Sequence, residues 1–294
     1  MKKSTLLVLA AGLLWGFMGF FVRKLELLGI SSTGAVTLRC SAAAICFALT
    51  ILLKDPKLFI VKWRHCWCFI GSGIFALLFF TYCYFTSMSY IDLSTAAILL
   101  YTAPSMVMVM SFILFKEKFT VLKLVALLMA FFGCCLVGGV GKGAVPLKGL
   151  LLGLGSGLGY ALFSIFARCA MNRGYSSLTV NFWSCLLAGA GAMMIWHPAP
   201  TLSVCFASAG NFALCAAMGA ISCYLPYMFY TKALEGMETG RASILASLEP
   251  VVASLVGILI FREPMSFASA CGVVLVLGAI IVLNVKNTHK CLKK

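Results

Sequence analysis

Residues 241–263 read RASILASLEPVVASLVGILIFRE, a long apolar stretch that a proline interrupts and a basic-acidic pair closes. Residues 95–117, which lie 146 positions earlier, read TAAILLYTAPSMVMVMSFILFKE and follow the same plan. An internal repeat of this kind is an early clue to architecture. It indicates that the chain is duplicated about its midpoint. The matched positions pair Ala96 with Ala242, Ile98 with Ile244, Leu99 with Leu245, Pro104 with Pro250, Phe115 with Phe261, Lys116 with Arg262 and Glu117 with Glu263.

The composition is that of a polytopic membrane protein. Of the 294 residues, 62% are hydrophobic and 11% are charged, and the mean hydropathy is +1.05. A soluble domain typically carries about 25% charged residues. The net charge of +15 does not indicate nucleic-acid binding, because the Lys and Arg residues lie in short segments between apolar runs and form no basic face. Juxtamembrane charges that set orientation explain it more simply.

The 14 cysteines are scattered through apolar segments and indicate reduced packing residues, without a disulfide framework. The cluster His65-Cys66-Trp67-Cys68 is too sparse for a closed zinc site, which usually has about four ligands. We therefore predict no metal and no other cofactor. The apolar run after Met1-Lys2-Lys3 is too long for a secretory signal peptide and predicts a retained first span.

A membrane-spanning helix needs about 20 mostly apolar residues, and this length predicts ten of them. The loops between the predicted spans are short, so the function has to lie in the helical bundle. The predicted spans are Ser4–Val22, Ser32–Leu53, Cys66–Tyr90, Leu93–Phe115, Leu122–Val140, Leu147–Cys169, Leu178–Trp196, Phe206–Thr231, Ala242–Phe261 and Met265–Asn284.

Alternate sides of the predicted bundle differ sharply in basic residues. One side, which includes both termini, holds 17 Lys and Arg residues, and the other side holds 5. The positive-inside rule then predicts that both termini are cytoplasmic, in a multi-pass protein of the cytoplasmic (inner) membrane. Ten spans divide into two units of five, residues 1–141 and 142–294. An odd number of spans inverts the second unit, an arrangement found in secondary transporters.

Several short motifs carry a resemblance to a known family. They are Trp15-Gly16, Leu38-Arg39, an Ala-x7-Pro pattern from Ala96 and again from Ala242, Glu249-Pro250, and a Glu that closes each of these two spans. Together they resemble the EamA-like family of the drug/metabolite transporter superfamily. The resemblance implies an all-α bundle of ten transmembrane helices in two inverted five-helix repeats. It also implies a central cavity that moves small metabolites. The cavity charges should be asymmetric, because the repeat position equivalent to Glu249 is Ala103 and the one equivalent to Arg39 is Ser184.

Two ionisable residues lie deep within predicted spans. Glu249 follows Arg241 by eight residues, so it lies about 12 Å into its span. Such an acid usually serves a cavity, a partner or a proton relay, although it could also help to close the kink at Pro250. Arg39 could hold a substrate carboxylate or pair with Glu249, or its long side chain could extend to the membrane surface.

Three prolines and a set of aromatic and amide side chains complete the candidate site. Proline removes a backbone hydrogen bond, so each proline predicts a static kink or a hinge. Aromatic rings with polar tips could stack on an organic substrate, although many face lipid instead. The hinge candidates are Pro104, Pro226 and Pro250. The predicted substrate-binding residues are Glu249, Arg39, Trp15, Tyr82, Tyr101, Tyr160, Asn181, Trp183, Tyr224 and Tyr227.

The glycines between Gly149 and Gly159 lack the Gly-Lys-Ser/Thr of a phosphate loop and predict close helix packing. The sequence contains no motif typical of catalysis, so we predict that the chain is not an enzyme.

We predict a secondary active transporter of a small organic metabolite that works by alternating access, and proton coupling through Glu249 is a further hypothesis. An amino acid or derivative is favoured, because one buried acid and one buried base could bind an amine and a carboxylate. Toxic organic cations, sugars and nucleotide-related metabolites stay open as substrates. A passive channel or a membrane assembly factor is the alternative of another class. The predicted partners are the substrate and membrane lipid, not nucleic acid.

Overall fold

The computed structural model describes residues 2–91, 93–138, 146–196, 198–262 and 266–291, and all regular structure within these ranges is helical. The expectation of an all-α chain is confirmed for this part. In chain order the helices are α1 (Lys2–Gly16), α2 (Met18–Leu27), α3 (Ser32–Lys54), η1 (Pro56–Phe59), η2 (Trp63–His65), α4 (Cys66–Ile70), η3 (Gly71–Leu78), α5 (Phe79–Ser87), α6 (Leu93–Leu100), α7 (Ala103–Phe115), α8 (Val121–Gly138), α9 (Leu147–Met171), α10 (Ser177–Trp196), α11 (Ala199–Phe206), α12 (Ala209–Gly219), η4 (Ala220–Tyr224), α13 (Leu225–Leu234), α14 (Thr239–Ala246), α15 (Glu249–Phe261) and α16 (Phe267–Cys291).

Eight helical stretches of the described chain are long and apolar enough to cross a membrane, judged by length and composition alone. Two shorter apolar helices, Val121–Val137 and Phe267–Leu283, lie where the fifth and tenth spans are predicted. The count of ten spans therefore stays a prediction. The eight longer stretches are Lys3–Leu27, Ser32–Lys54, Trp63–Ser87, Thr95–Phe115, Leu147–Met171, Ser177–Trp196, Ala209–Leu234 and Thr239–Phe261.

The eighth predicted span begins too early. Phe206 belongs instead to α11, a short helix that precedes the span, and α12 begins only at Ala209. The reason is local, because the Ser208 side chain accepts a hydrogen bond from the Asn211 N–H and caps the new helix. Serine at this position stabilises a helix start by about 1 kcal/mol.

Three of the longer stretches are interrupted near their middle. Residues 101–102 separate α6 from α7, and residues 247–248 separate α14 from α15. Pro104 and Pro250 lie in the first turns of α7 and α15, where proline fits because the first N–H groups of a helix have no partner. The break at Phe17, between α1 and α2, has no proline and was not predicted.

Other backbone features recur at the same spacing as the sequence motifs. Lys116 and Arg262, 146 positions apart, both adopt the left-handed conformation that ends α7 and α15, with φ of 54° and 56°. Gly29 and Gly174, 145 positions apart, have φ of 81° and 87°. The π-helical segments η3 and η4 lie in the third and eighth predicted spans. Glu263 and the junction at 139–145 lie outside the described residues.

Helices of the first part of the chain pack against helices of the second part, and each such pair has a counterpart related by the repeat. The pair of α1 with α13 has as its counterpart the pair of α9 with α5. The other three pairs each join a helix to its own counterpart: α3 with α10, α7 with α14, and α8 with α16. A Cβ on Gly73 would lie 3.0 Å from the Ser184 carbonyl. A Cβ on its counterpart Gly219 would lie 3.5 Å from the Arg39 carbonyl, so the same kind of close approach occurs in both parts of the chain.

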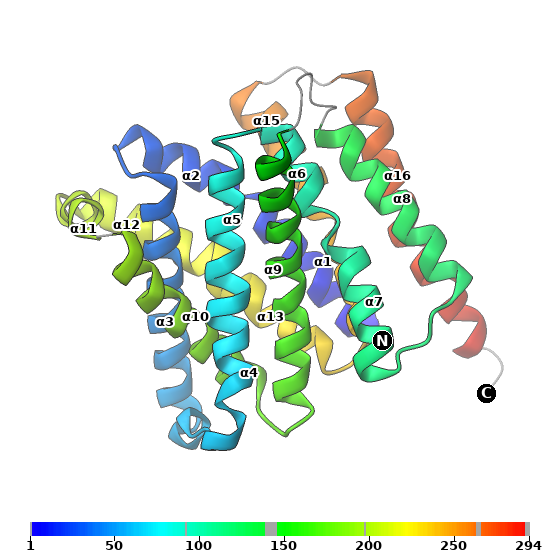
Figure 1. Cartoon of the computed structure of the whole chain (residues 1–294), viewed down its shortest axis with the longest axis horizontal. Helices are drawn as coiled ribbons and strands as arrows, with labels where there is room; N and C mark the ends of the chain where they lie inside the picture. The colour runs from blue at the N-terminus through cyan, green and yellow to red at the C-terminus, as the bar shows by residue number, and fades with distance from the viewer. Residues whose placement is uncertain (1, 92, 139–145, 197, 263–265, 292–294) are drawn as a thin grey trace.

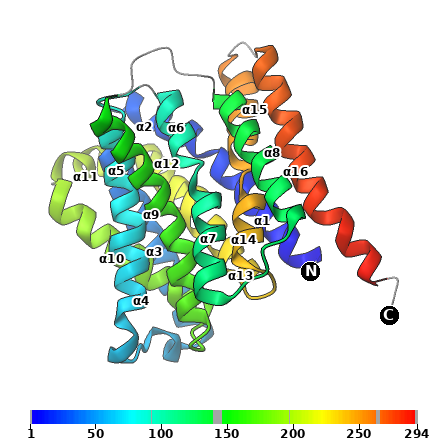
Figure 2. The ribbon, with the colours of Figure 1, turned by 45° about the vertical axis from the view of Figure 1, so that its right-hand side comes forward.

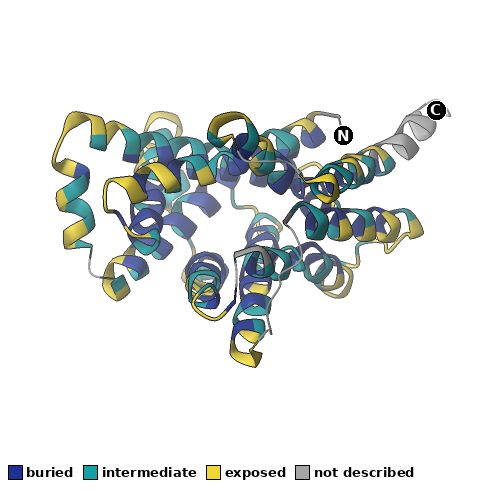
Figure 3. Ribbon diagram, turned by 90° about the horizontal axis from the view of Figure 1, so that it is seen from above, coloured by how far each residue is buried: buried dark blue, intermediate teal, exposed yellow. Residues whose placement is uncertain are grey.

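Figures 1 and 2 show the two termini toward the same end of the bundle, while α8 and α16 lie together at one side. Seen from above in Figure 3, the buried residues turn toward the interior of the bundle and the exposed residues lie around its periphery. The largest group of buried apolar residues joins α1, α3, α9, α10, α13 and α14. The core therefore combines helices from both parts of the chain.

Candidate functional site

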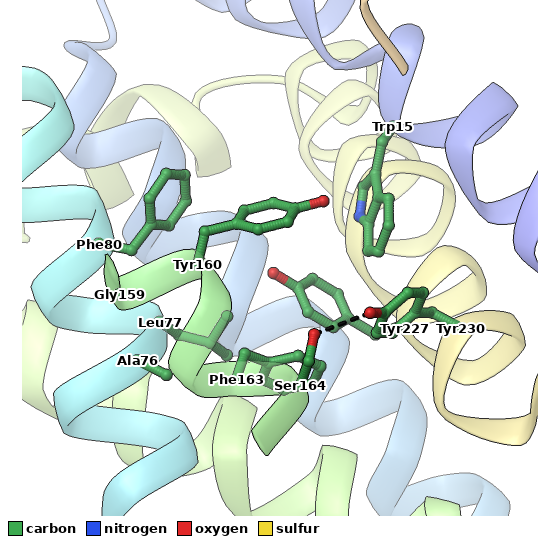
Figure 4. A pocket seen from close by; sticks show the side chains of 10 residues that line it. All are labelled: Trp15, Ala76, Leu77, Phe80, Gly159, Tyr160, Phe163, Ser164, Tyr227 and Tyr230. Atoms are coloured by element: carbon green, nitrogen blue, oxygen red, sulfur yellow. Dashed lines mark hydrogen bonds between the residues drawn. The ribbon is translucent and has the colours of Figure 1, made fainter. Parts of the chain in front are cut away.

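A small cavity lies where α1, η3, α5, α9 and α13 meet, within an empty space of about 280 Å³ that includes space open to solvent. Its wall is largely aromatic, and Figure 4 shows the rings converging from different helices. The Trp15 ring centroid lies 6.3 Å from that of Tyr160, 5.3 Å from that of Tyr227 and 5.5 Å from that of Tyr230. Rings with polar tips suit an organic molecule, because they offer apolar area and hydrogen-bonding groups together. The lining residues are Trp15, Ala76, Leu77, Phe80, Gly159, Tyr160, Phe163, Ser164, Tyr227 and Tyr230.

Close helix packing brings these rings together. A Cβ on Gly159 would lie 2.8 Å from the Phe80 backbone, and one on Gly16 would lie 2.5 Å from the Val252 Cβ. Glycine at these positions lets α9 approach α5 and lets α1 approach α15. Each of these glycines is adjacent in sequence to a ring of the cavity. The prediction that the glycine-rich run is a packing surface is confirmed at Gly159.

A second small cavity lies beside the helix breaks at 101–102 and 247–248, within an empty space of about 240 Å³ that includes space open to solvent. Glu249 begins α15 and is only partly buried although it lies within a span, because it borders this cavity. Tyr160 lines both cavities, and its hydroxyl donates to Glu249 Oε2 at 3.4 Å. The side chain of Tyr160 therefore separates Glu249 from the aromatic cavity and contacts both. The lining residues are Leu100, Tyr101, Ala103, Pro104, Tyr160, Ser243, Ala246, Ser247 and Glu249.

Arg39 is buried, with 4% of its surface exposed, so its side chain does not extend to the membrane surface. Its Nη1 donates to the Met18 thioether, and its Nε has no hydrogen-bond partner. Among the described residues, no ion pair joins it to Glu249. A buried charge is stable only when it is well compensated, and a thioether is a weak acceptor. A role toward a substrate carboxylate stays a prediction for Arg39, which lines neither cavity.

Four other predicted residues also lie outside the two cavities. Tyr82 is 48% exposed on the outer surface of α5. Asn181 is buried and donates through Nδ2 to Thr231 Oγ1 at 2.8 Å, which ties α10 to α13. Trp183 donates through Nε1 to a carbonyl of η1 at 3.1 Å. The Tyr224 hydroxyl forms a 2.8 Å hydrogen bond with a threonine of α3. The contacts of Asn181, Trp183 and Tyr224 join helices to one another.

The sequence reasoning missed several residues of the aromatic cavity. Tyr230 lines it from α13, and its hydroxyl forms a 2.8 Å hydrogen bond with Ser164 of α9, drawn as a dashed line in Figure 4. Phe163 lines it as well. A periodic signal was present, because Tyr230 follows Tyr227 by three positions and Phe163 follows Tyr160 by three. Residues three apart on a helix share a face.

The loop after α7 contacts the first turn of α14. Glu117, which follows α7, accepts the Thr239 N–H through Oε1 at 2.6 Å and the Gly240 N–H through Oε2 at 3.1 Å. The carboxylate therefore caps the start of α14, where free N–H groups and the helix dipole favour a negative charge. We call these two hydrogen bonds the Glu117 contact.

Neighbouring side chains form further bonds beside the Glu117 contact. Arg168 donates from α9 to Thr239 Oγ1 at 2.9 Å and to the carbonyl of Met237. Lys123 forms an ion pair with Glu238 at 2.7 Å. Arg23, the repeat counterpart of Arg168, is instead exposed, and its guanidinium lies 4.4 Å above the centre of the Phe261 ring.

The sequence matches the model of the EamA-like transporter family twice, over residues 2–139 and 147–285. The chain belongs to this family. It is similar to an "Uncharacterized transporter" of Archaeoglobus fulgidus, with 24% identity over 286 residues that cover 96% of this chain and 99% of the relative. It is also similar to the "Uncharacterized transporter YxxF" of Bacillus subtilis, with 23% identity over 297 residues that cover 98% and 92% of the two chains.

A solved structure titled "Crystal structure of protein" superposes with a TM-score of 0.82 and covers 97% of each chain, at 17% identity. At this level of identity the likeness shows the fold alone. The resemblance predicted from the motifs is confirmed by the family match. The chain is an EamA-family transporter with several apolar helices suited to a multi-pass membrane protein. The family and these relatives are named as transporters, which agrees with the prediction that the chain is not an enzyme.

Proposed function

We propose that the protein is a secondary active transporter that moves a small organic metabolite across the cytoplasmic membrane by alternating access. The observation that carries this proposal is the position of Glu249, an acid at a proline-linked helix break that borders a cavity within the bundle. Ionisable residues at such depth usually mark a transport pathway. In transporters built of repeats, the substrate site commonly lies at interrupted helices between the repeats.

The proposal includes two inverted five-helix repeats with ten spans in all. Its support is the recurrence of left-handed residues and of the proline-linked helix breaks at spacings of 145 or 146, together with a π-helical segment in the third and in the eighth predicted span. The packing between the two parts of the chain is a second support. It keeps the same set of contacts when each span is replaced by its counterpart, as a two-fold relation requires. The basic residues counted on each side favour cytoplasmic termini, and both termini lie toward the same end in Figure 1.

Alternating access requires that each end of the bundle can close in turn. The Glu117 contact is the candidate for closure at one end. Its repeat counterpart, Glu263, lies outside the described residues. Breaks at Pro104 and Pro250 provide points where half-helices could tilt. Pro226, the third hinge candidate, is the second residue of α13, just after η4, whose looser winding offers a similar point.

The substrate class that we favour is an amino acid or a derivative. Glu249 is suited to a cationic group, and the buried Arg39 is suited to an anionic group. Rings of Trp15, Tyr160 and Tyr227 supply contact area for an apolar portion. A further hypothesis is that Glu249 takes up and releases a proton during the cycle and so couples transport to the proton gradient.

Counterflow in proteoliposomes tests the function. A metabolite library is first screened by thermal shift, because a ligand that binds only the folded state raises the melting temperature. A compound that binds is then loaded inside the vesicles, and uptake of its labelled form is followed. Transient accumulation above equilibrium supports a carrier, and passive equilibration without counterflow would identify a channel.

The Glu249→Gln variant tests the proton hypothesis in the same vesicles. We expect it to lose both transport driven by a pH gradient and the pH dependence of the rate. The proton role is excluded if this variant keeps the rate and the pH dependence of the parent protein.

A further inference from the structure

Two backbone carbonyls lose their helical donors beside the smaller cavity. In an α-helix each carbonyl accepts the N–H of the residue four positions later, and proline has no N–H. Pro104 cannot donate to Leu100, and Pro250 cannot donate to Ala246. Leu100 and Ala246 both line this cavity. A buried carbonyl without its partner is unfavourable, so a donor from a ligand would be stabilised there.

A glycine of the neighbouring helix stands opposite each of these carbonyls. A Cβ on Gly157 of α9 would lie 3.3 Å from the Leu100 oxygen, and one on Gly12 of α1 would lie 3.5 Å from the Ala246 oxygen. Helices α9 and α1 therefore pack closely beside these two carbonyls, and no side chain of Gly157 or Gly12 lies between the helix and the oxygen. The arrangement occurs at matching positions in both parts of the chain, 145 or 146 residues apart.

The remaining groups of this cavity complete a site for a cation. Glu249 supplies the negative charge, and Tyr160 and the hydroxyls of Ser243 and Ser247 supply further oxygens. The helix starts at α7 and α15 could instead favour an anion. That effect is weak here, because Thr102 O already accepts the first free N–H groups of α7 and Glu249 itself stands in the first turn of α15.

We infer that the smaller cavity binds a primary ammonium group of the transported molecule, with Glu249 balancing its charge and the Leu100 and Ala246 carbonyls accepting its hydrogens. The inference rests on the proposed transport function and defines its substrate class more narrowly. A primary ammonium has three N–H donors, which match one carboxylate and two carbonyls. A quaternary ammonium has no N–H, and a neutral alcohol has no charge. The rest of the substrate then extends past Tyr160 into the aromatic cavity.

Binding of matched probes to the purified protein tests this subsite without requiring transport. The probes are 2-phenylethylammonium, its N,N,N-trimethyl analogue and 2-phenylethanol, each titrated by thermal shift in sodium-free buffer. We expect 2-phenylethylammonium to bind at least tenfold more tightly than either analogue. A fourth titration with NaCl against KCl tests whether sodium occupies the site instead.

Variants assign the binding to the named groups. Glu249→Gln should weaken 2-phenylethylammonium binding at least tenfold, because it removes the charge. Pro104→Ala and Pro250→Ala each restore an N–H donor to a free carbonyl and should each weaken binding roughly three- to tenfold. Pro226→Ala is the matched control. The N–H that it restores would reach the carbonyl of Ser222, a residue that lines neither cavity. It should bind the probe as the parent protein does.

The inference is wrong if the trimethyl analogue binds as tightly as the primary ammonium, or if Pro104→Ala and Pro250→Ala behave like Pro226→Ala. It is also wrong if sodium alone gives a stabilisation that depends on Glu249 and competes with the amine. Should a compound without an amine show counterflow while 2-phenylethylammonium does not bind, the subsite fails and the transport function stands. Binding without counterflow for any ligand would instead overturn the transport function.

Discussion

Replacing Glu117 by Gln should loosen the contact between the loop after α7 and the first turn of α14. The carboxylate accepts two backbone N–H groups of α14, at 2.6 and 3.1 Å. Hydrogen bonds to a charged group contribute about 1.5–3 kcal/mol each, and the partial exposure of Glu117 argues for the lower value, or about 3 kcal/mol for both. Gln keeps one neutral acceptor worth about 1 kcal/mol. The net loss of about 2 kcal/mol corresponds to a factor of about 30 in the opening equilibrium.

Hydrogen exchange measured by mass spectrometry, on protein reconstituted in lipid nanodiscs, reports this opening directly. Peptides that cover residues 239–246 should exchange about 30-fold faster in Glu117→Gln, whereas peptides of α3 should be unchanged. Exchange at an amide follows the free energy of local opening.

A neighbouring ion pair provides the comparison. Lys123 pairs with Glu238 at 2.7 Å, but 44% of the Glu238 side chain is exposed. Exposed pairs contribute about 0–1 kcal/mol, so Lys123→Ala should accelerate the same peptides less than about fivefold. Equal effects of the two substitutions, or an unchanged α14 in Glu117→Gln, would refute the assignment of the closure to the Glu117 contact.

Two further predictions concern packing and polar contacts between helices. Gly16→Ala places a Cβ 2.5 Å from Val252, so it should cost about 1–3 kcal/mol and lower the melting temperature, whereas Gly19→Ala, with nothing within 4 Å, should raise it slightly. A destabilised Gly19→Ala with an unaffected Gly16→Ala would contradict this packing. Asn181→Leu removes the 2.8 Å hydrogen bond to Thr231, and a double-mutant cycle with Thr231→Val should give a coupling of about 0.6–1.7 kcal/mol in chemical unfolding from lipid. A coupling of zero would show that the bond does not stabilise the fold.

Apolar length and proline position predicted most of the fold, because both leave a direct mark in the sequence. The helix breaks before Pro104 and Pro250 are examples. The break at Phe17 and the π-helical segments leave no such mark. A π-helix differs from an α-helix only in which carbonyl each N–H reaches, and the residues of Gly71–Leu78 would suit either form. The short helix α11 was missed because residues 199–205 are too few for a span and include Pro200, a residue typical of loops and helix starts.

The site was predicted more completely for charge than for aromatic residues. A carboxylate within an apolar span is conspicuous, and Glu249 does border a cavity. Aromatic residues are not conspicuous there, because lipid and a substrate cavity both favour rings. Composition therefore could not separate Tyr82, on the outer surface, from Tyr84, on the same helix and partly buried. Only the packing of α5 against α9 decides between them.

The packing between the two parts of the chain also bears on biogenesis. During synthesis the first five predicted spans leave the ribosome before α9, α10 and α13 exist, yet α1, α3 and α5 pack against those later helices. Early helices must therefore reside in lipid with their eventual contact surfaces exposed. The charge of Arg39 on α3 is therefore not buried until α10 and η4 have been synthesised and have packed against this helix. Insertion and folding are separate stages for such a chain.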